Sequence, residues 1–342
     1  VIGIATCDMG RLKDGSEGPN FEQGIELHAK QTVFSEGCRG HLGKILIKKF
    51  NLDIESSPQT YGIGIKELWE ISPEKSKPGS ILHTTGWPLK SDTYGGSFLY
   101  HLDKNKISIG FVVGLDYKNP YLSPYMEFQR FKHHPEIKKI LEGGRRINYG
   151  ARALNEGGIQ SLPKLTFPGG MLVGCEAGFL NVPKIKGTHL AMKSGIIAAS
   201  TILENIDTKD EISNFEDQIK NSWVWSELYK VRNIRPSFKW GFWKAIVYSA
   251  LDTYIFRGNA PWTIDHHGTD HESLENKNKH EKINYPKPDN IISFDRLTNV
   301  SFSGTNHEEN QPCHLTLKNE DVPIKTNLEL YDNPETLYCP AG

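Results

Sequence analysis

A glycine-rich stretch, Phe167 to Gly195, carries residue types whose spacing could form the wall of a cofactor site. The apolar run Met171 to Val173 predicts a buried strand, the glycines after it predict a turn, and a helix is expected from Thr188 to Asn205. Glycine lets a backbone approach a ligand, and the first turn of a helix offers free N–H groups to an electron-rich ligand atom. The same pattern also fits an ordinary βα unit of an α/β protein, so both interpretations stay open.

A second turn of this kind follows Phe34. The string Glu36-Gly-Cys-Arg-Gly-His-Leu42 joins a strand expected within Gly24–Phe34 to a helix expected over Leu42–Phe50. A strand, a small-residue turn and a helix close over the nucleotide half of FAD in many flavoproteins. Arg39 and His41 could contact phosphate there, or they could be solvated surface residues.

Histidines and cysteines give little support for a metal site. The histidines of Phe131-Lys-His-His-Pro135 and of Asp265-His-His-Gly-Thr-Asp-His271 lack the spacing of a metal-binding face, so solvated or capping roles are expected. The five cysteines are an odd number without close spacing, which favours a reducing compartment over a disulfide framework. Cys339 precedes a proline, as ligands of iron–sulfur clusters often do, but one cysteine cannot hold a cluster.

The balance of charge and the two ends of the sequence set further limits. The chain has 342 residues, which is long enough for two or three domains. Its 40 basic and 41 acidic residues nearly cancel, so no net positive electrostatic field would attract nucleic acid, and nucleic acid is not expected as a partner. Val1 to Thr6 resembles an interior strand, and Cys339 to Gly342 follows no terminal element. We therefore expect an internal piece of a longer protein.

Alternation of apolar and polar residues between Thr60 and Val113 predicts a mostly antiparallel sheet. Its third strand opens with Asp92-Thr-Tyr-Gly-Gly96, whose glycine pair could let a planar ligand meet the backbone or could form a tight turn.

The other expected elements follow along the chain. Strands are expected at 61–69, 80–87, 95–102 and 106–113, helices at 124–132, 136–141, 215–220 and 223–229, and a loop at 8–20. The tail, 259–342, is expected to be polar and nearly helix-free, with short strands at 291–294, 314–317 and 328–331.

The segment Phe238 to Phe256 is long enough to cross a bilayer as a helix, but Lys239, Lys244 and Asp252 interrupt it. Bulky aromatic residues flanked by Lys and Arg favour a helix that lies in the headgroup layer of a membrane. A helix in the protein core would have a similar sequence, so that alternative stays open.

Taken together and in order, seven strings resemble the electron transfer flavoprotein–ubiquinone oxidoreductases, membrane-associated flavoproteins of mitochondria and some bacteria. The resemblance covers essentially the whole chain. The strings are Glu36-Gly-Cys-Arg-Gly-His-Leu42, Tyr94-Gly-Gly-Ser-Phe-Leu-Tyr-His-Leu102, Asn119-Pro-Tyr-Leu-Ser-Pro124, Gly150-Ala-Arg-Ala-Leu-Asn-Glu-Gly-Gly158, Asn181-Val-Pro-Lys-Ile-Lys-Gly-Thr-His189, Ser303-Gly-Thr-Asn-His307 and Tyr338-Cys-Pro-Ala-Gly342.

The resemblance implies an oxidoreductase that uses FAD and one [4Fe–4S] cluster. Electrons would come from reduced electron transfer flavoprotein and leave to ubiquinone in the membrane, and the cofactors would carry the redox chemistry. The implied location is the matrix face of the mitochondrial inner membrane, or the cytoplasmic membrane of a bacterium, with the segment at about 238–256 resting on the membrane surface.

The fold class implied is mixed α/β (α+β): an FAD-binding Rossmann-like domain with an inserted antiparallel-sheet quinone-binding domain and the start of a ferredoxin-like iron–sulfur domain. The expected division of the chain is 1–55 (FAD, first part), 56–165 (ubiquinone sheet), 166–235 (FAD, return), 236–260 (membrane helix) and 261–342 (start of the cluster domain).

Carried over by position, the resemblance also implies site residues. Cofactor-binding positions are Gly37, Gly40, His41, Gly174, Cys175, Gly178, Asn181, Gly187 and Thr188. Quinone-binding positions are Tyr94, Gly95 and Gly96, and Cys339 is the first cluster ligand.

Two departures from the usual flavoprotein pattern stand out. Gly174-Cys175-Glu176 replaces the Gly-Asp whose carboxylate commonly binds ribityl. The dinucleotide fingerprint and three further cluster cysteines are not in the sequence. Two alternatives therefore stay open: a related FAD-dependent isoprenoid (geranylgeranyl) reductase, or a truncated piece that acts only in binding or as a scaffold.

Overall fold

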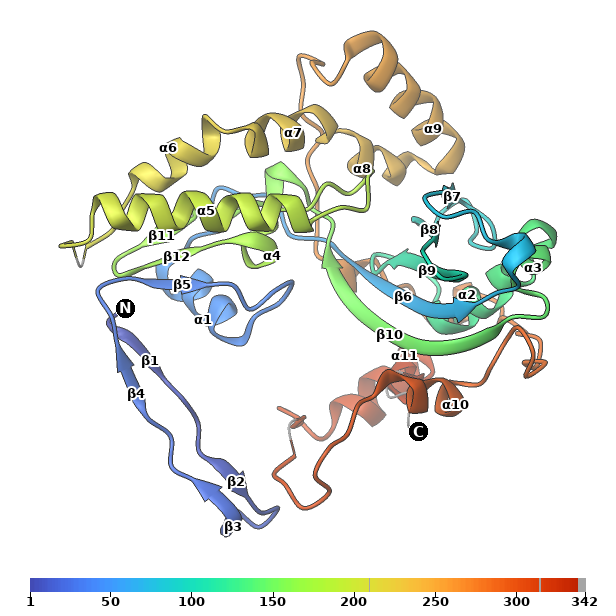
Figure 1. The fold of residues 1–342 in the computed structure, drawn as a ribbon, viewed down its shortest axis with the longest axis horizontal. Helices are drawn as coiled ribbons and strands as arrows, with labels where there is room; N and C mark the ends of the chain where they lie inside the picture. The colour runs from blue at the N-terminus through green and yellow to red at the C-terminus, as the bar shows by residue number, and fades with distance from the viewer. Residues whose placement is uncertain (209, 314, 338–342) are drawn as a thin grey trace.

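The antiparallel sheet predicted from the sequence forms the centre of one half of the molecule (Figure 1). The structure is a computed structural model and describes residues 1–208, 210–313 and 315–337. Five strands run in the order β10-β6-β9-β8-β7, and each neighbouring pair is antiparallel. They are β6 (Tyr61–Glu70), β7 (Ile81–Thr85), β8 (Gly95–His101), β9 (Lys106–Gly114) and β10 (Arg145–Asn155).

The helices α2 (Pro124–Lys132) and α3 (Pro135–Leu141) form the core of this half together with the sheet. Proline at the first position and the Ser123 side chain, which accepts from the Met126 N–H, start α2. Trp69, Ile107, Ile109 and Phe128 are fully buried at the interface. The two short 3₁₀ helices η1 (Pro73–Lys75) and η2 (Ile159–Ser161) lie in the connections.

The other half is an α/β unit in which two distant strands pair in parallel. The strand β5 (Thr32–Phe34) lies beside β12 (Gly170–Leu172), which in turn pairs with β11 (Thr166–Phe167). Helices cover the small sheet from both sides, with α5 to α7 on one side and α1 on the other (Figure 1). They are α1 (His41–Phe50), α4 (Gly174–Ala177), α5 (Thr188–Glu204), α6 (Asn214–Lys220) and α7 (Trp223–Val231). The predicted strand–turn–helix after Phe167 and the mixed α/β class are confirmed.

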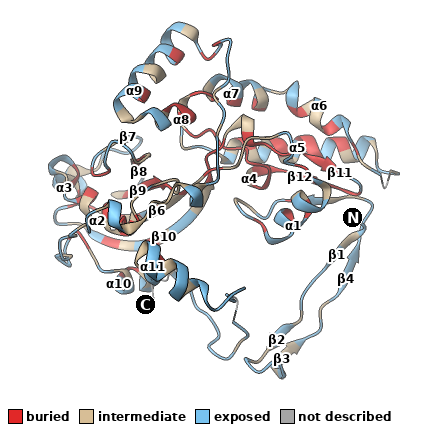
Figure 2. Ribbon diagram, turned by 180° about the vertical axis from the view of Figure 1, so that it is seen from behind, coloured by how far each residue is buried: buried red, intermediate tan, exposed pale blue. Residues whose placement is uncertain are grey.

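An extended arm projects from the α/β unit, and its residues are mostly exposed (Figures 1 and 2). Two small antiparallel ladders form it, β1 (Gly3–Ala5) with β4 (Glu26–His28) and β2 (Met9–Arg11) with β3 (Glu17–Glu22). The loop predicted at 8–20 is therefore wrong, as is a single strand over Gly24–Phe34. The Asp8 carboxylate, which accepts from Arg11 and from the Gly24 N–H, ties the two ladders together.

The segment predicted as one helix over Phe238–Phe256 is broken. It follows α8 (Ile234–Ser237) and consists of η3 (Phe238–Trp240), α9 (Phe242–Ala250) and a π-helical turn, η4 (Leu251–Phe256). Gly241 at φ 90° ends η3, because this conformation is not helical and strongly favours glycine. Across the described ranges, no helix has both the length and the apolar content that spanning a bilayer requires.

The tail contains several short helices, and its segment from about residue 283 to residue 303 packs against α2 and the edge strand β10 (Figure 1). They are η5 (Asp270–Ser273), η6 (Lys277–Lys279), α10 (Arg296–Val300), η7 (Ser301–Ser303), η8 (Val322–Leu328), α11 (Glu329–Tyr331) and η9 (Pro334–Leu337). The expectation of a nearly helix-free tail is wrong, and the strands expected at 291–294 and 328–331 are absent. Asp289 Oδ1 accepts from three successive N–H groups, of Ile291, Ile292 and Ser293, and this turn replaces the first strand. Residues 315–317 form no strand, and residue 314 lies outside the described residues.

Candidate functional site

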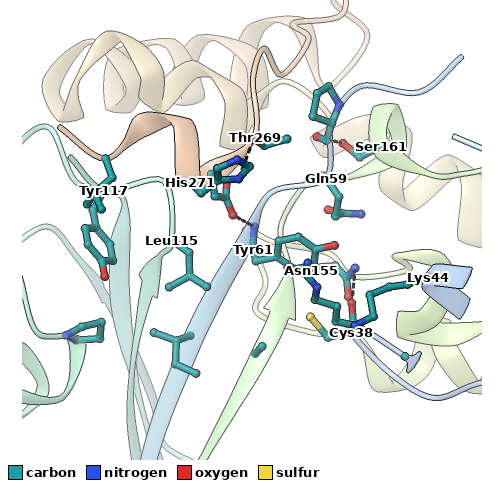
Figure 3. A pocket seen from close by; sticks show the side chains of 18 of the residues that line it. Cys38, Lys44, Gln59, Tyr61, Leu115, Tyr117, Asn155, Ser161, Thr269 and His271 are labelled. Carbon is teal, nitrogen blue, oxygen red and sulfur yellow. Dashed lines mark hydrogen bonds between the residues drawn. The ribbon is translucent and has the colours of Figure 1, made fainter. Parts of the chain in front are cut away.

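A cavity of about 1240 Å³ lies between the α/β unit and the large sheet. One wall comes from Cys38, Arg39 and Gly40, and the opposite wall from side chains of β6 and β10 such as Tyr61. Figure 3 shows Tyr61, Asn155 and Cys38 meeting at its centre, where the Asn155 amide donates to the Cys38 carbonyl at 3.3 Å. The cavity is large enough for a cofactor-sized molecule.

The turn after β12 has the backbone that close approach of a ligand requires. Gly174 and Gly178 have φ of 60° and 101°, in the left-handed region that favours glycine. The Gly174 N–H donates to Ser194 Oγ at 3.0 Å, and a Cβ on Gly174 would lie 3.2 Å from the Cβ of Ala191. The turn is thus held tightly against α5.

The first turn of α5 is open to a ligand. Gly187 precedes the helix and no side chain caps it, while Thr188 is exposed. Cys175 lies beside this end, with its Sγ 3.6 Å from where a Cβ on Gly187 would be. The structure therefore brings together four predicted positions, Gly174, Cys175, Gly187 and Thr188, around uncapped N–H groups, which suits the electron-rich edge of a flavin ring.

The first turn of α1 is closed by carboxylates instead. Glu36 accepts from the N–H groups of Leu42 and Gly43 at 3.3 and 2.8 Å. The buried Glu176 lies against Gly40 and Gly43, and its Oε2 has no hydrogen-bond partner. Burial, and after it repulsion from the Glu36 carboxylate, raises the pKa of Glu176 to about 7. Two carboxylates at this turn fit hydroxyl groups of a ligand better than phosphate.

Three of the other cofactor-binding positions have different surroundings. Gly37 has φ 97° and faces the guanidinium of Arg152, whose Nη2 would lie 3.1 Å from a Cβ there. His41 is exposed on the first turn of α1. Asn181 is fully buried, with its amide donating to Glu227 and its Oδ1 accepting from the Lys184 N–H, so its side chain shapes the loop before α5.

Apart from Arg39, the cationic and aromatic residues near the cavity were not singled out from the sequence. The Arg39 guanidinium lies 5.5 Å from the Tyr61 ring centroid, and Lys44 also lines the cavity. Arg152, on β10, has no sequence neighbour that points to a ligand; only the pairing of β10 with β6 brings it to this side. Burial raises the pKa of the nearby Cys38 thiol to about 12, so this cysteine is a neutral wall residue.

The quinone-binding positions lie away from this cavity, at the start of β8. Gly95 and Gly96 pair with β9, and the Gly95 carbonyl accepts from Thr85 Oγ1 at 2.9 Å. The Tyr94 ring packs edge-on against Phe238 with centroids 4.7 Å apart. The predicted quinone segment thus adjoins the segment predicted to lie on a membrane.

The described ranges contain no group of three or more His, Cys, Asp or Glu residues that could hold a metal ion. His266 points its Nε2 at the Gly157 carbonyl, 2.9 Å away, which is a structural contact. Cys339, the predicted cluster ligand, lies outside the described residues.

An α/β unit with glycine-rich turns that faces an antiparallel sheet across a cavity is the arrangement of a large class of flavin-dependent oxidoreductases. The family described as "ETF-QO, ubiquinone-binding" matches residues 61–154, and the family described as "Electron transfer flavoprotein-ubiquinone oxidoreductase, 4Fe-4S" matches residues 290–342. The chain belongs to the electron transfer flavoprotein–ubiquinone oxidoreductase family, as the resemblance predicted.

Known proteins of this family are similar in sequence to the whole of this chain. The mitochondrial electron transfer flavoprotein–ubiquinone oxidoreductase of Sus scrofa is 58% identical over 354 aligned residues, which include 100% of this chain and 57% of the relative. That of Dictyostelium discoideum is 52% identical over 358 residues, with 100% and 59% covered. The chain therefore spans less than two thirds of the length of these relatives.

Among solved structures, a geranylgeranyl bacteriochlorophyll reductase-like protein of Thermoplasma acidophilum has a TM-score of 0.49 at 15% identity, with 68% of this chain and 61% of that chain covered. A flavin-dependent brominase has a TM-score of 0.45 at 15% identity, with 70% and 59% covered.

Proposed function

We propose that this chain is the quinone-reducing part of an oxidoreductase that takes electrons from reduced electron transfer flavoprotein and passes them, through FAD and a [4Fe–4S] cluster, to ubiquinone. The observation that carries the proposal is the contact between the predicted quinone segment and an exposed apolar surface. Identity of 52–58% to proteins of that name supports it, as do the two matching family descriptions.

The apolar surface is defined here as the membrane patch: the exposed apolar side chains of Trp240, Trp243, Ile246, Val247, Leu251, Tyr254 and Ile255 on η3, α9 and η4. Lys239, Lys244 and Arg257 flank it and are also exposed. The Phe242 N–H donates to the Ser91 carbonyl at 2.9 Å, two residues before Thr93-Tyr94. A quinone with a long isoprenoid tail must enter from lipid, so a site at the root of such a patch suits it.

FAD would supply two-electron chemistry and one-electron exchange when bound. We propose that Gly187 and Thr188 hold its flavin side through backbone N–H groups at the start of α5. Gly174 and Gly178, whose own N–H groups are bonded within the protein, would let the turn approach the ring closely, with Cys175 beside them in place of the usual Asp. Gly37, Gly40 and His41 would border the nucleotide half, where Arg152 and Lys44 supply positive charge. Asn181 would hold the loop that precedes α5.

The remaining assignments follow the proposed activity. The division into 1–55, 56–165, 166–235, 236–260 and 261–342 accommodates both family matches, and Cys339 would be the first ligand of the cluster. The relatives are named mitochondrial, and we propose that this protein rests on the matrix face of the inner membrane, with the membrane patch in the headgroup layer.

The test is to express the complete reading frame and record optical and EPR spectra. We expect a flavin absorption spectrum, and on reduction the EPR signal of a [4Fe–4S] cluster, together with reduction of ubiquinone when reduced electron transfer flavoprotein is supplied. A protein that binds neither group, or that binds both and leaves ubiquinone oxidised, contradicts the proposal.

A glycine substitution tests the flavin side. Gly174→Ala is expected to weaken FAD binding by about 5- to 30-fold, because a left-handed residue with a Cβ costs about 1–2 kcal/mol and the added methyl meets Ala191. Gly195→Ala in α5 is the matched control, since nothing lies within 4 Å of its Cβ position. Flavin fluorescence on titration measures both affinities, and equal affinities would remove the turn from the FAD site.

A further inference from the structure

Buried charges to which the proposed function gives no role gather where β9 and β10 end and α8 begins. Arg235 Nε donates to Glu156 Oε2 at 3.1 Å, and Arg235 Nη2 donates to Asp116 Oδ1 at 2.9 Å. Arg235 and Glu156 are only 5% and 2% exposed, whereas Asp116 is partly exposed. We call these three residues the carboxylate cluster.

The large sheet leaves space for the carboxylate cluster at a pair of glycines. Gly62 in β6 and Gly114 in β9 lie directly opposite each other. A Cβ on Gly62 would overlap Glu156 Oε1, and a Cβ on Gly114 would lie 2.7 Å from Asp116 Oδ1 and 2.9 Å from Arg235 Nη2. Any larger residue at either position would displace the charges.

The rings of Tyr94 and Phe238 lie between the carboxylate cluster and the membrane patch. The Arg235 guanidinium carbon lies 4.1 Å from the centroid of the Tyr94 ring, and Phe238 packs on that ring. The Gly114 N–H donates to the Tyr94 carbonyl at 2.9 Å, which fixes the start of β8 over the cluster. The buried charges thus adjoin the first residue of the proposed quinone segment.

The carboxylate cluster carries an excess of negative charge. It sets two carboxylates against one guanidinium, and a third carboxylate, Asp270, adds to their repulsion while accepting from Thr60 Oγ1 and the Tyr61 N–H. Buried like charges of this kind favour uptake of a proton. Burial raises the pKa of Glu156 to about 7, against the lowering effect of Arg235.

The other titratable groups around Glu156 do not compensate this charge. Burial lowers the pKa of His266 to about 4, so its ring is neutral at neutral pH. Arg232 donates hydrogen bonds to the backbone carbonyls of four residues and to Thr263 Oγ1; the four residues are Tyr229, Gly258, Ala260 and Trp262. Burial and Glu156 both raise the pKa of Tyr94, which stays a neutral phenol.

A small cavity lies beside Glu156. About 10 Å³ of space is lined by Glu156, Arg235 and Gly158 together with Leu180 and Val182. This is close to the smallest volume that holds one water molecule.

We propose that Glu156, oriented by Arg235, stores a proton that ubiquinone consumes when it is reduced at Tyr94–Gly96. The inference rests on the proposed function. Ubiquinone takes up two electrons from the reduced cofactors and two protons, one from the Glu156 carboxyl and one from solvent, to form the quinol. The Glu156 carboxylate then takes a proton from solvent through the partly exposed Asp116.

The test uses Glu156→Gln in the FAD- and cluster-loaded protein from the complete reading frame, with a short-chain ubiquinone as acceptor. Loss of one proton donor is expected to slow ubiquinone reduction by roughly 10²-fold. The wild-type rate should fall as pH rises through about 7, and the variant should lose this step. Electron entry from electron transfer flavoprotein into FAD should not change, because it needs no proton from this site.

Three controls keep the test decisive. Glu127→Gln alters another buried carboxylate, paired with Arg130 and with a pKa raised by burial, and should keep the wild-type pH profile. Glu156→Asp should restore part of the rate. Infrared spectra should show a protonated carboxyl that titrates near neutral pH in the wild type and is missing in Glu156→Gln.

A Glu156→Gln protein with the wild-type rate and pH profile, or with the carboxyl band still present, overturns the inference. A wild type that does not reduce ubiquinone overturns the proposed function instead.

Discussion

Replacing Lys132 with Met is expected to lower the free energy of unfolding by about 3–5 kcal/mol, because it leaves a buried carboxylate without its cation. Lys132 is fully buried, and its Nζ lies 3.0 and 2.9 Å from the two oxygens of Glu67, itself 1% exposed. Glu67 also accepts from Trp69 Nε1 and from the Asn299 amide. The ion pair therefore joins the large sheet, α2 and the tail.

Lys139→Met is the matched control. Its Nζ lies 2.7 Å from Glu136, a shorter distance than in the buried pair, but both side chains are more than two thirds exposed. Such pairs contribute about 0–1 kcal/mol. Denaturant unfolding of the two variants measures the difference, and similar losses would mean that burial does not decide the strength of the pair.

The same substitution should loosen the tail. Phe294 lies between Lys132 and the Arg146 guanidinium, at 5.1 and 3.7 Å from its ring centroid, and Arg146 also donates to Asn299. Limited proteolysis of Lys132→Met should therefore cut faster within residues 290–313 than in the control. Equal cutting would show that these contacts do not hold the tail.

The second large effect concerns the membrane patch. Trp243→Ser combined with Ile255→Ser should weaken binding to liposomes by about 10²- to 10⁴-fold, since each apolar side chain transferred from water contributes about 1.5–3 kcal/mol. These two side chains are 75% and 67% exposed, so the fold should not change. Phe242 is less suitable, because it packs on Phe238, Trp243 and Gly86.

Ile54→Ser removes an equally exposed apolar side chain, 81% exposed, from the α/β unit and should leave liposome binding unchanged. Sedimentation with vesicles of neutral and anionic lipid measures the partition of each variant. Unaltered binding of the double variant would assign the patch to a protein contact instead.

Local patterns predicted most of the regular elements. The helices α1, α2, α3, α5, α6 and α7 begin and end within about two residues of their expected bounds, because apolar periodicity and capping residues lie within each segment. The strand β10 was missed, since Arg145, Arg146 and Arg152 interrupt its pattern and only its pairing with β6 makes it a strand. The break at Gly241 was also overlooked, although a glycine inside a helical pattern could have indicated it.

The candidate site was predicted only in part, for a similar reason. Glycine positions near β12 and α5 are close in the sequence, so a strand–turn–helix pattern finds them. Tyr61 and Asn155 line the cavity, and Arg152 lies against Gly37, only because segments about 90 residues apart pair with each other. Nothing in their own sequence neighbourhood indicates a ligand. Glu156 and Arg235 were missed for the same reason. Glu156 follows β10 and Arg235 lies in α8, so only the folded structure brings them together.

The pairing of β5 with β12 also has a consequence for how the chain folds. These two strands are separated by more than 130 residues, whereas Tyr61 and Asn155, at the two ends of the large sheet, pair directly with each other. The large sheet can therefore form early from its own hairpins and bring Phe34 and Leu172 near each other before they pair. Synthesis would complete this inserted sheet first, and the α/β unit would close around its two adjacent ends afterwards.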